Sequence, residues 1–316
     1  MIDISTLTIV CRLWRVRAAR LRPDLLPAGS PDRSLERWVV EDEAGQLYVV
    51  ERLDPRTAPH KMRVAAILDA LARAGLDKAH GYLEDSAGWH VLPLGNSYWQ
   101  ISPYLRGEPV PRPGWVQEGW RGQALADFII ELRRVTTGLS LPPGDPFSIR
   151  DFVITLDGRL SQERPELASQ IAPIVEPLLD RWLGPDVPLH TAFCHGDPHP
   201  LNVIWQEQEI RAVIDWEFCG TKPQAYDVAL LIGCAGSEDP EALKGPFVRA
   251  LLARLRAAGH PAAADPALWA LVLGIRFGWL SEWLRRADEE MLALELDYMR
   301  LLVERRDELR GAWGAM

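Results

Sequence analysis

The stretch that decides the fold reads HGDPHPLN over residues 195–202 and VIDWE over residues 213–217. Asp197 is followed, after four intervening residues, by Asn202. A short predicted hairpin then leads to Asp215 at the end of an apolar run. In this order, the three side chains can deprotonate a hydroxyl group and hold a metal-bound nucleotide.

Each of the three residues suits one part of that chemistry. Phosphoryl transfer to an alcohol needs a carboxylate within hydrogen-bond reach of the attacking hydroxyl, and Asp197 is predicted to lie in a loop. Asn202 and Asp215 offer hard oxygen donors of the kind that hold Mg²⁺ against phosphates. Asp and Asn also cap ordinary turns, but the spacing, the hairpin and the second Asp together favour the chemical interpretation.

Composition excludes some function classes. The chain has 316 residues and a net charge of −9, from 35 basic and 44 acidic residues. A nucleic-acid binder usually presents a basic face, so nucleic acid is not an expected partner. The negative charge would favour cationic or neutral substrates, although solubility explains it more simply.

Four scattered cysteines, without CxxC spacing, argue against a disulfide framework or a zinc site and fit a reducing cytosol. The longest apolar segment, residues 267–275, is too short to span a bilayer, and no secretory signal is visible. We therefore predict a cytoplasmic location and no membrane partner.

Two lobes are expected from the pattern of elements. Residues 1–101 read as a small, strand-rich lobe with one helix near residues 61–74, and residues 41–46 read as a hairpin turn. Residues 103–113 carry four prolines and one glycine, which indicates a connector. Residues 102–316 read as a larger, mostly helical lobe. Helices are predicted at residues 117–138, 165–183, 240–259, 266–286 and 287–310. This arrangement is α+β.

The motif block also carries a family resemblance. HGDPHPLNV with VIDWE, then YDVA at residues 226–229, resembles the aminoglycoside phosphotransferase and choline kinase superfamily, whose members share the protein-kinase-like fold. The resemblance implies ATP and Mg²⁺ as cofactors and Asp197 as the catalytic base. It further implies Asn202 and Asp215 as magnesium ligands, and Asp227 as a residue that buttresses the catalytic loop.

The same resemblance extends loosely over the connector. It places an interlobe hinge at residues 99–107, where backbone groups around Ser102 and Tyr104 would meet the adenine. Only eleven residues separate Asp215 from Asp227, which leaves no room for a long activation segment. We therefore expect a small-molecule acceptor, such as an aminoglycoside-, choline- or homoserine-like compound, rather than a protein.

The predicted third strand departs from the family. The family usually has a lysine there that contacts phosphates, whereas this sequence has Glu51. One hypothesis is a swapped ion pair between Glu51 and Lys61 or Arg63 that leaves a basic side chain for phosphate. A second is that Arg52 is the phosphate ligand, which requires a bulge because adjacent strand residues point to opposite faces. A third is a weak or inactive, kinase-like binding protein.

Other residues allow more than one interpretation. Trp279, Glu282 and Trp283 combine aromatic faces with a carboxylate and could bind the ammonium group of an acceptor, or they could be core and solvated residues. Glu217 could touch a second metal or simply end a strand. His199, with Asp197 and Asp215, would suit a metal-dependent hydrolase.

Two loop features complete the predictions. Residues 27–31, PAGSP, are a candidate for the loop that covers the phosphates. His195 is expected to hold the loop through hydrogen bonds. Taken together, the sequence predicts an ATP- and Mg²⁺-dependent phosphotransferase that moves the γ-phosphoryl group to a hydroxyl of a small molecule. The sequence does not predict an oligomeric state.

Overall fold

The computed structural model describes residues 4–25, 34–144 and 146–314. These residues form two compact units that are interleaved along the chain. The sheet unit comprises Met1–Val110, Val135–Pro143 and Pro200–Cys219, and the helical unit comprises Pro111–Arg134, Gly144–His199 and Gly220–Met316. The lobe boundary predicted between residues 101 and 102 stays a prediction.

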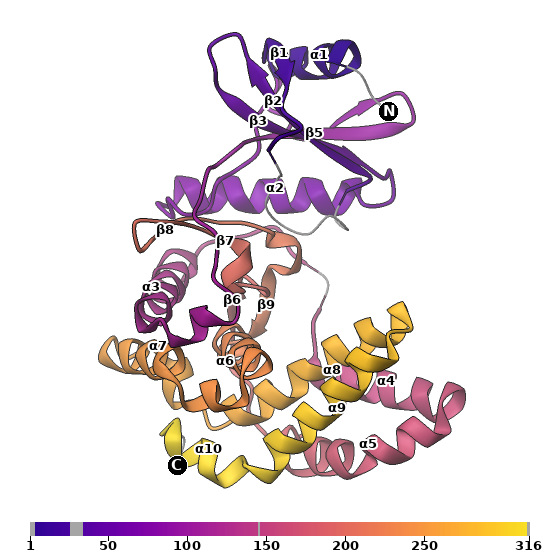
Figure 1. Ribbon diagram of the computed structural model, residues 1–316, viewed down its shortest axis with the longest axis vertical. Coiled ribbons are helices and arrows are strands. Elements are labelled where there is room, and N and C mark those ends of the chain that lie inside the picture. Colours follow the sequence, from indigo (N-terminus) through magenta and orange to yellow (C-terminus); the bar gives the residue numbers. More distant parts are fainter. Residues whose placement is uncertain (1–3, 26–33, 145, 315–316) are drawn as a thin grey trace. The chain divides into compact units, whose positions relative to one another are not determined.

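A five-stranded antiparallel sheet forms the sheet unit, with the strand order β1-β2-β3-β5-β4 (Figure 1). The strands are β1 (Ala18–Leu21), β2 (Glu36–Asp42), β3 (Leu47–Leu53), β4 (Leu92–Leu94) and β5 (Ser97–Pro103). The predicted β2–β3 hairpin is present. Asp42 Oδ1 accepts hydrogen bonds from the backbone N–H groups of Ala44 (2.9 Å) and Gln46 (2.8 Å). Gly45, at φ 80°, supplies the left-handed residue of the turn.

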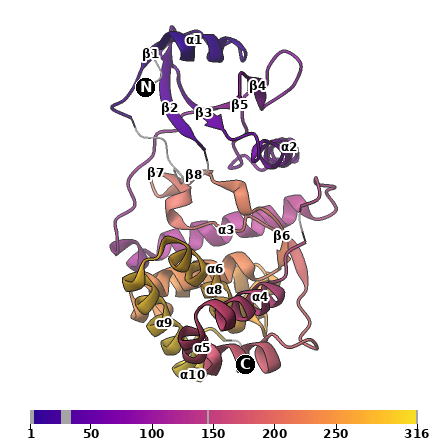
Figure 2. The ribbon, with the colours of Figure 1, turned by 90° about the vertical axis from the view of Figure 1, so that its right-hand side faces the viewer.

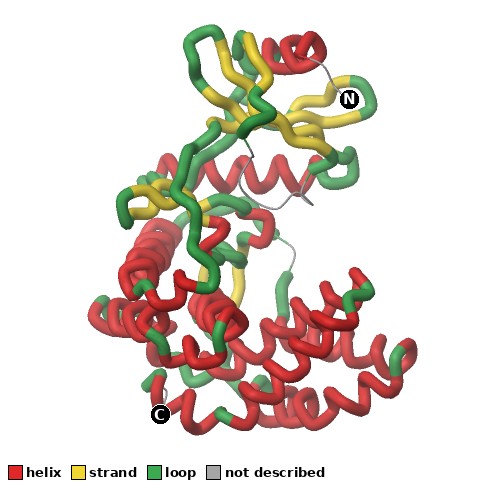
Figure 3. Tube along the Cα trace, viewed as in Figure 1, coloured by secondary structure: helices red, strands yellow, loops and turns green. Residues whose placement is uncertain are grey.

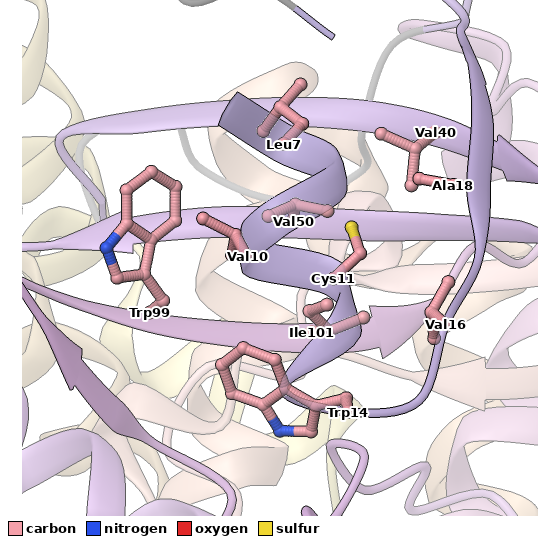
Figure 4. Close-up of a cluster of buried hydrophobic side chains, with 10 residues drawn as sticks. All are labelled: Leu7, Val10, Cys11, Trp14, Val16, Ala18, Val40, Val50, Trp99 and Ile101. Carbon is pink, nitrogen blue, oxygen red and sulfur yellow. The ribbon is translucent and has the colours of Figure 1, made fainter. Parts of the chain in front are cut away.

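Helix α1 (Ile4–Arg12) covers one face of this sheet and was not predicted. Its buried residues Leu7, Val10 and Cys11 recur at helical spacing over only nine residues, which is a weak signal in a sequence. Figure 4 shows these side chains packed against residues from the strands, including Val40, Val50 and Ile101. The expectation of a single helix in the first hundred residues was therefore wrong. Burial in this cluster raises the pKa of the Cys11 thiol to about 12.

Helix α2 (Ala58–Arg73) is the helix predicted near residues 61–74. Its buried face includes Val64, Ile67, Leu68 and Leu71. A proline in the first turn suits a helix start, because the missing N–H would have no partner inside the helix there.

The helical unit is dominated by α8 (Leu268–Arg286), which packs against α4 (Ile149–Glu163), α6 (Tyr226–Glu238) and α9 (Glu289–Glu304) (Figure 2). Figure 3 shows that helices make up most of this unit. The remaining elements are α3 (Gly119–Thr136), α5 (Pro165–Pro177), α7 (Pro246–Ala257), α10 (Arg306–Ala312), and the antiparallel strands β6 (Thr191–Cys194) and β9 (Gly220–Pro223).

The helical predictions need three corrections. The helix predicted at residues 287–310 is divided at Arg305 into α9 and α10. The sequence interpretation missed α4, although Ser148 Oγ caps it by accepting a hydrogen bond from the Asp151 backbone N–H at 3.1 Å. The helix predicted at residues 240–259 is divided, because Gly245 is extended and Pro246 starts the new helix α7. None of the described helices combines the length and hydropathy needed to cross a bilayer.

Candidate active site

The loop that carries Asp197 follows strand β6 in the helical unit and is held by Asp227 at the start of α6. The two carboxylate oxygens of Asp227 accept hydrogen bonds from the backbone N–H groups of His195 and Gly196, both at 2.8 Å. Gly196 adopts φ 88°, a conformation that favours glycine. Burial raises the pKa of Asp227 to about 6, although the two N–H groups act in the opposite direction. The contact predicted for Asp227 is therefore present.

Two histidines shape the same loop. The fully buried His195 accepts a hydrogen bond at Nδ1 from the Asp197 backbone N–H (3.1 Å), as its predicted loop-holding role requires. His199 meets the ring of Trp115 edge-on, with the ring centroids 5.9 Å apart. Burial lowers the pKa of His199 to about 4, so its ring is neutral at neutral pH. Asp197 itself is half-buried.

Asn202 and Asp215 belong to the sheet unit, at the two ends of a hairpin. Strands β7 (Val203–Gln206) and β8 (Glu209–Val213) pair antiparallel, and Glu207 and Gln208 both have positive φ, as a two-residue type I′ turn requires. The Ile214 backbone N–H donates to the Asn202 carbonyl oxygen at 2.8 Å. The predicted hairpin is therefore confirmed, and it returns the chain to Asn202 just before Asp215.

The backbone at Asp215 is unusual. Its φ of 63° and ψ of 55° place it in the left-handed region, which few residues other than glycine adopt and which Asp tolerates better than most. Such conformations concentrate at functional sites. The amide oxygen of the largely buried Asn202 and the carboxylate of Asp215 are a donor set that suits Mg²⁺.

A pocket within the sheet unit brings Asp215 together with the predicted hinge. Ser102 and Tyr104 line it alongside Asp215, and so do residues of β2, β3 and α2. The described lining comprises Arg37, Val49, Glu51, Lys61, Leu68, His80, Gly81, Tyr82, Ser102, Pro103, Tyr104, Leu105, Ile204, Ile214, Asp215, Trp216 and Glu217. The Tyr104 backbone N–H donates to the Leu47 carbonyl oxygen at 2.9 Å, so any adenine contact would fall to other backbone groups of this segment.

Arg52 does not reach this pocket. Its guanidinium forms a salt bridge with Glu36 at 2.6 Å, whereas the neighbouring Glu51 lines the pocket. The register of β3 is continuous with both β2 and β5 and contains no bulge. The geometry that a phosphate-binding Arg52 required is therefore missing, and this prediction needs correction.

The swapped ion pair also differs from the expectation. Glu51 accepts hydrogen bonds from Gln100 Nε2 and from Ser34 Oγ (3.0 Å). Lys61 forms its ion pair with Glu217, Nζ to Oε1 at 2.5 Å, rather than with Glu51. Arg63 donates to the Cys219 carbonyl oxygen at 3.3 Å and is not part of the described pocket lining.

The structure also bears on the predicted phosphate loop and on the predicted metal site at His199. The candidate phosphate loop at residues 27–31 lies outside the described residues, between β1 and β2. Within the described ranges, the His, Asp and Glu side chains close enough to share an ion are Asp69, Glu84 and His90. In that group, His90 Nε2 already lies 2.5 Å from Asp69 Oδ2. His199 belongs to no such group.

The predicted acceptor residues lie together on α8 of the helical unit. Trp279 and Trp283 stack with ring centroids 5.9 Å apart. Glu282 pairs with Arg285 (2.7 Å) and Arg286 (2.6 Å), and hydrogen bonding to Arg285 in particular lowers its pKa to about 2. The charge of Glu282 is therefore already compensated by two cations of its own helix.

The motif geometry agrees with a family match. A model of the phosphotransferase enzyme family matches residues 28–267. The chain belongs to this family. The enzyme class and the superfamily resemblance predicted from the motifs are thereby confirmed. A search of the curated proteins finds no match.

Solved structures show the same fold at low sequence identity. A thermostable mutant of aminoglycoside phosphotransferase APH(4)-Ia with ADP and hygromycin B has a TM-score of 0.64 and 15% identity, over 94% of this chain and 96% of that chain. The amicoumacin kinase hAmiN with AMP-PNP, Ca²⁺ and Ami has a TM-score of 0.62 and 14% identity, over 96% and 94%. A choline/ethanolamine kinase family protein from Mesorhizobium loti has a TM-score of 0.59 and 16% identity, over 98% of each chain. The predicted α+β, protein-kinase-like fold is confirmed.

The sequence interpretation missed an ion pair among the residues that line the pocket. Lys61 and Glu217 lie 156 positions apart, so the sequence suggests a role for each residue but does not pair them. His60 joins them, with Nε2 placed 2.9 Å from the Glu217 carbonyl oxygen and 3.1 Å from its carboxylate. The signal that the sequence offers for this contact is the adjacent pair His60 and Lys61 near the start of a predicted helix.

Proposed function

We propose that this protein is an ATP- and Mg²⁺-dependent phosphotransferase that moves the γ-phosphoryl group of ATP to a hydroxyl of a small molecule. The observation that carries the proposal is that Asp215 lines the same pocket as the hinge residues Ser102 and Tyr104. This pocket offers a surface for the nucleotide base and an oxygen ligand for the metal within one compact unit. Family membership supports the same reaction class.

The proposed roles follow from the chemistry of each group. Asp197 accepts the proton of the acceptor hydroxyl while that oxygen bonds to the γ-phosphorus and the bond from the γ-phosphorus to the departing ADP oxygen breaks. Asn202 and Asp215 would hold Mg²⁺, which supplies neutralisation of the phosphate charge. The hydrogen bonds from His195 and Gly196 to Asp227 keep the loop of Asp197 in one conformation.

The acceptor class is proposed from charge and likeness. Fold neighbours include a complex with hygromycin B and a choline/ethanolamine kinase family protein, so an aminoglycoside-, choline- or homoserine-like acceptor is the candidate. The net charge of −9 suits a cationic compound. Stacked Trp279 and Trp283 remain a proposed contact surface. Glu282 would act there only by exchanging an arginine partner for the acceptor.

A cytoplasmic location is proposed from the four scattered cysteines, which fit a reducing compartment.

The experiment is an Asp197→Asn variant tested for ADP release with a panel of aminoglycosides and amino alcohols, and for ATP binding by calorimetry. We expect transfer to fall by about 10³-fold or more while ATP affinity stays near that of the wild type, because the base acts on the acceptor. Asp297→Asn is the matched control, since Asp297 is an exposed residue of α9 paired with Arg300. Normal turnover by Asp197→Asn would show that the base is assigned wrongly.

Glu51 supports one other candidate, a binding protein of the same fold with weak or no catalysis, because it brings a carboxylate into the pocket. Calorimetry on the wild type, with and without Mg²⁺, separates the two. Metal-dependent ATP binding supports the phosphotransferase. The absence of binding at millimolar nucleotide, with or without the acceptor panel, supports the binding protein. A hydrolase would instead act without nucleotide.

A further inference from the structure

Lys61 is a buried lysine in the pocket of the sheet unit. Its side chain is 4% exposed and that of its partner Glu217 is 9% exposed. Burying two charges has a desolvation cost that their attraction often fails to exceed, so such a pair is weak evidence for a stabilising role. A buried ion pair that lines a pocket therefore invites a functional explanation.

Glu217 links this lysine to the proposed metal ligand. It lies two residues after Asp215, in the 3₁₀ turn Trp216–Phe218. The ion pair therefore ties helix α2 to the segment that carries Asp215. His60 strengthens the tie, because its Nε2 lies within hydrogen-bond distance of both the carbonyl and the carboxylate oxygens of Glu217.

The phosphates of a bound nucleotide would need a cation at this end of the pocket. Asp215 would hold a metal ion that neutralises phosphate charge, so the triphosphate would extend toward Asp215. The strand position that usually supplies a lysine holds Glu51, and Arg52 turns toward Glu36. Lys61 lines the pocket beside that segment, and its ammonium group has three N–H donors. It can thus hold Glu217 with one donor and a phosphate oxygen with another.

We propose that Lys61 of α2 contacts the nucleotide phosphates, and that Glu217 is the positioning residue that holds its ammonium group. In the usual arrangement a strand supplies the lysine and the helix supplies the glutamate. Here helix α2 supplies the lysine, and the 3₁₀ turn after Asp215 supplies the glutamate. This proposal rests on the proposed function, because it concerns the same nucleotide. It assigns a phosphate-binding role to a helix residue and gives Glu217 a role other than that of a metal ligand.

The first test compares ATP with adenosine, which lacks phosphates, by calorimetry in the presence of Mg²⁺. Lys61→Met should weaken ATP binding about 30-fold, equivalent to about 2 kcal/mol, and leave adenosine binding within about twofold. Arg63→Met is the matched control. Arg63 is a basic residue of the same helix that bonds to the Cys219 carbonyl oxygen, and we expect neither affinity to change.

The outcomes separate this proposal from the one on which it rests. Equal weakening of ATP and adenosine would give Lys61 a structural role only, and unchanged ATP binding would remove it from the site; either result overturns the proposal. If the wild type binds no ATP, the proposed function fails first. If Lys61→Met and Arg63→Met bind ATP with equal affinity, and also bind adenosine with equal affinity, the proposed function stays intact. Only the role of Lys61 is then overturned.

A double-mutant cycle tests the role of Glu217 through the same ATP affinities. Glu217→Gln should weaken ATP binding about fivefold alone and have no further effect in the Lys61→Met background, because it acts through the lysine. The double variant Lys61→Met with Glu217→Gln removes both buried charges. It therefore keeps the test available if Lys61→Met alone does not fold, and should show the same 30-fold loss. An equal effect of Glu217→Gln in both backgrounds would mean that Glu217 acts independently of Lys61, and would overturn its positioning role.

Discussion

Replacing Asp227 by asparagine should change the pH dependence of stability in a direction that the structure specifies. Asp227 is 3% exposed, and Lys222 is the cation whose charge opposes the effect of burial. Its pKa rises from the ordinary value of 3.8 to about 6 in the folded protein. The folded state therefore binds the proton more tightly than the unfolded state, and stability is lost as the pH rises through that interval.

The size of the effect follows from that difference in pKa. At 1.36 kcal/mol per pH unit, a rise from 3.8 to about 6 corresponds to about 3 kcal/mol of unfolding free energy. Below about pH 4, the protonated Asp227 resembles asparagine, with one oxygen left to accept an N–H group. At pH 7 the wild type carries a buried carboxylate and the variant does not. The unfolding free energy of Asp227→Asn, minus that of the wild type, should therefore increase by about 3 kcal/mol between about pH 3 and pH 7.

Urea unfolding of both proteins at a series of pH values, followed by tryptophan fluorescence and circular dichroism, measures this difference. Exposed carboxyl groups with lowered pKa values, such as Glu308, also make stability depend on pH. Their contributions cancel in the difference, because both proteins contain them. A difference that is flat or that decreases with pH would refute the reasoning. It would show that the N–H groups of His195 and Gly196 stabilise the carboxylate at least as much as burial destabilises it.

Two further predictions concern packing and charge in the helical unit. Gly122→Ala should lower the unfolding free energy by about 1–3 kcal/mol, because the added Cβ would overlap the Phe247 carbonyl oxygen. The control is Gly158→Ala, whose Cβ meets no atom within 4 Å. This variant should raise the unfolding free energy by about 0.5–1 kcal/mol. Arg276→Met should lower it by about 3–5 kcal/mol, because Glu295 is left buried and charged, whereas Arg276→Met with Glu295→Leu should recover most of the loss. Urea unfolding measures both effects, and a double variant no more stable than the single one would contradict the second.

Local patterns explain which parts of the fold the sequence could predict. The β7–β8 hairpin and α2 were found because apolar spacing and turn position act within a few residues. Helix α1 was not predicted because nine residues give little periodicity, and because its packing partners come from four strands, β1, β2, β3 and β5. Helix α4 was missed although Ser148 and Asp151 form a local cap, a signal that the sequence did contain.

In the candidate site, too, the sequence predicts what is local and not what depends on the tertiary fold. Asp197, Asn202 and Asp215 could be named because one short motif carries them. Alternation along β3 correctly indicated that Glu51 and Arg52 cannot share a face without a bulge. The register contains no bulge, and Glu51 is the one of the two that lines the pocket. The partner of Lys61 could not be named, since only the tertiary fold brings a residue 156 positions away to its ammonium group.

The acidic residue on β3 therefore does not by itself predict a loss of nucleotide binding. Glu51 is engaged by Gln100 and Ser34, so its carboxylate is solvated by protein donors. The attraction between a cation and a phosphate depends on their separation and surroundings, not on the element that supplies the cation. Because Lys61 supplies that charge from α2, nucleotide binding in this chain should depend on the position of the helix more than on the sequence of the strand.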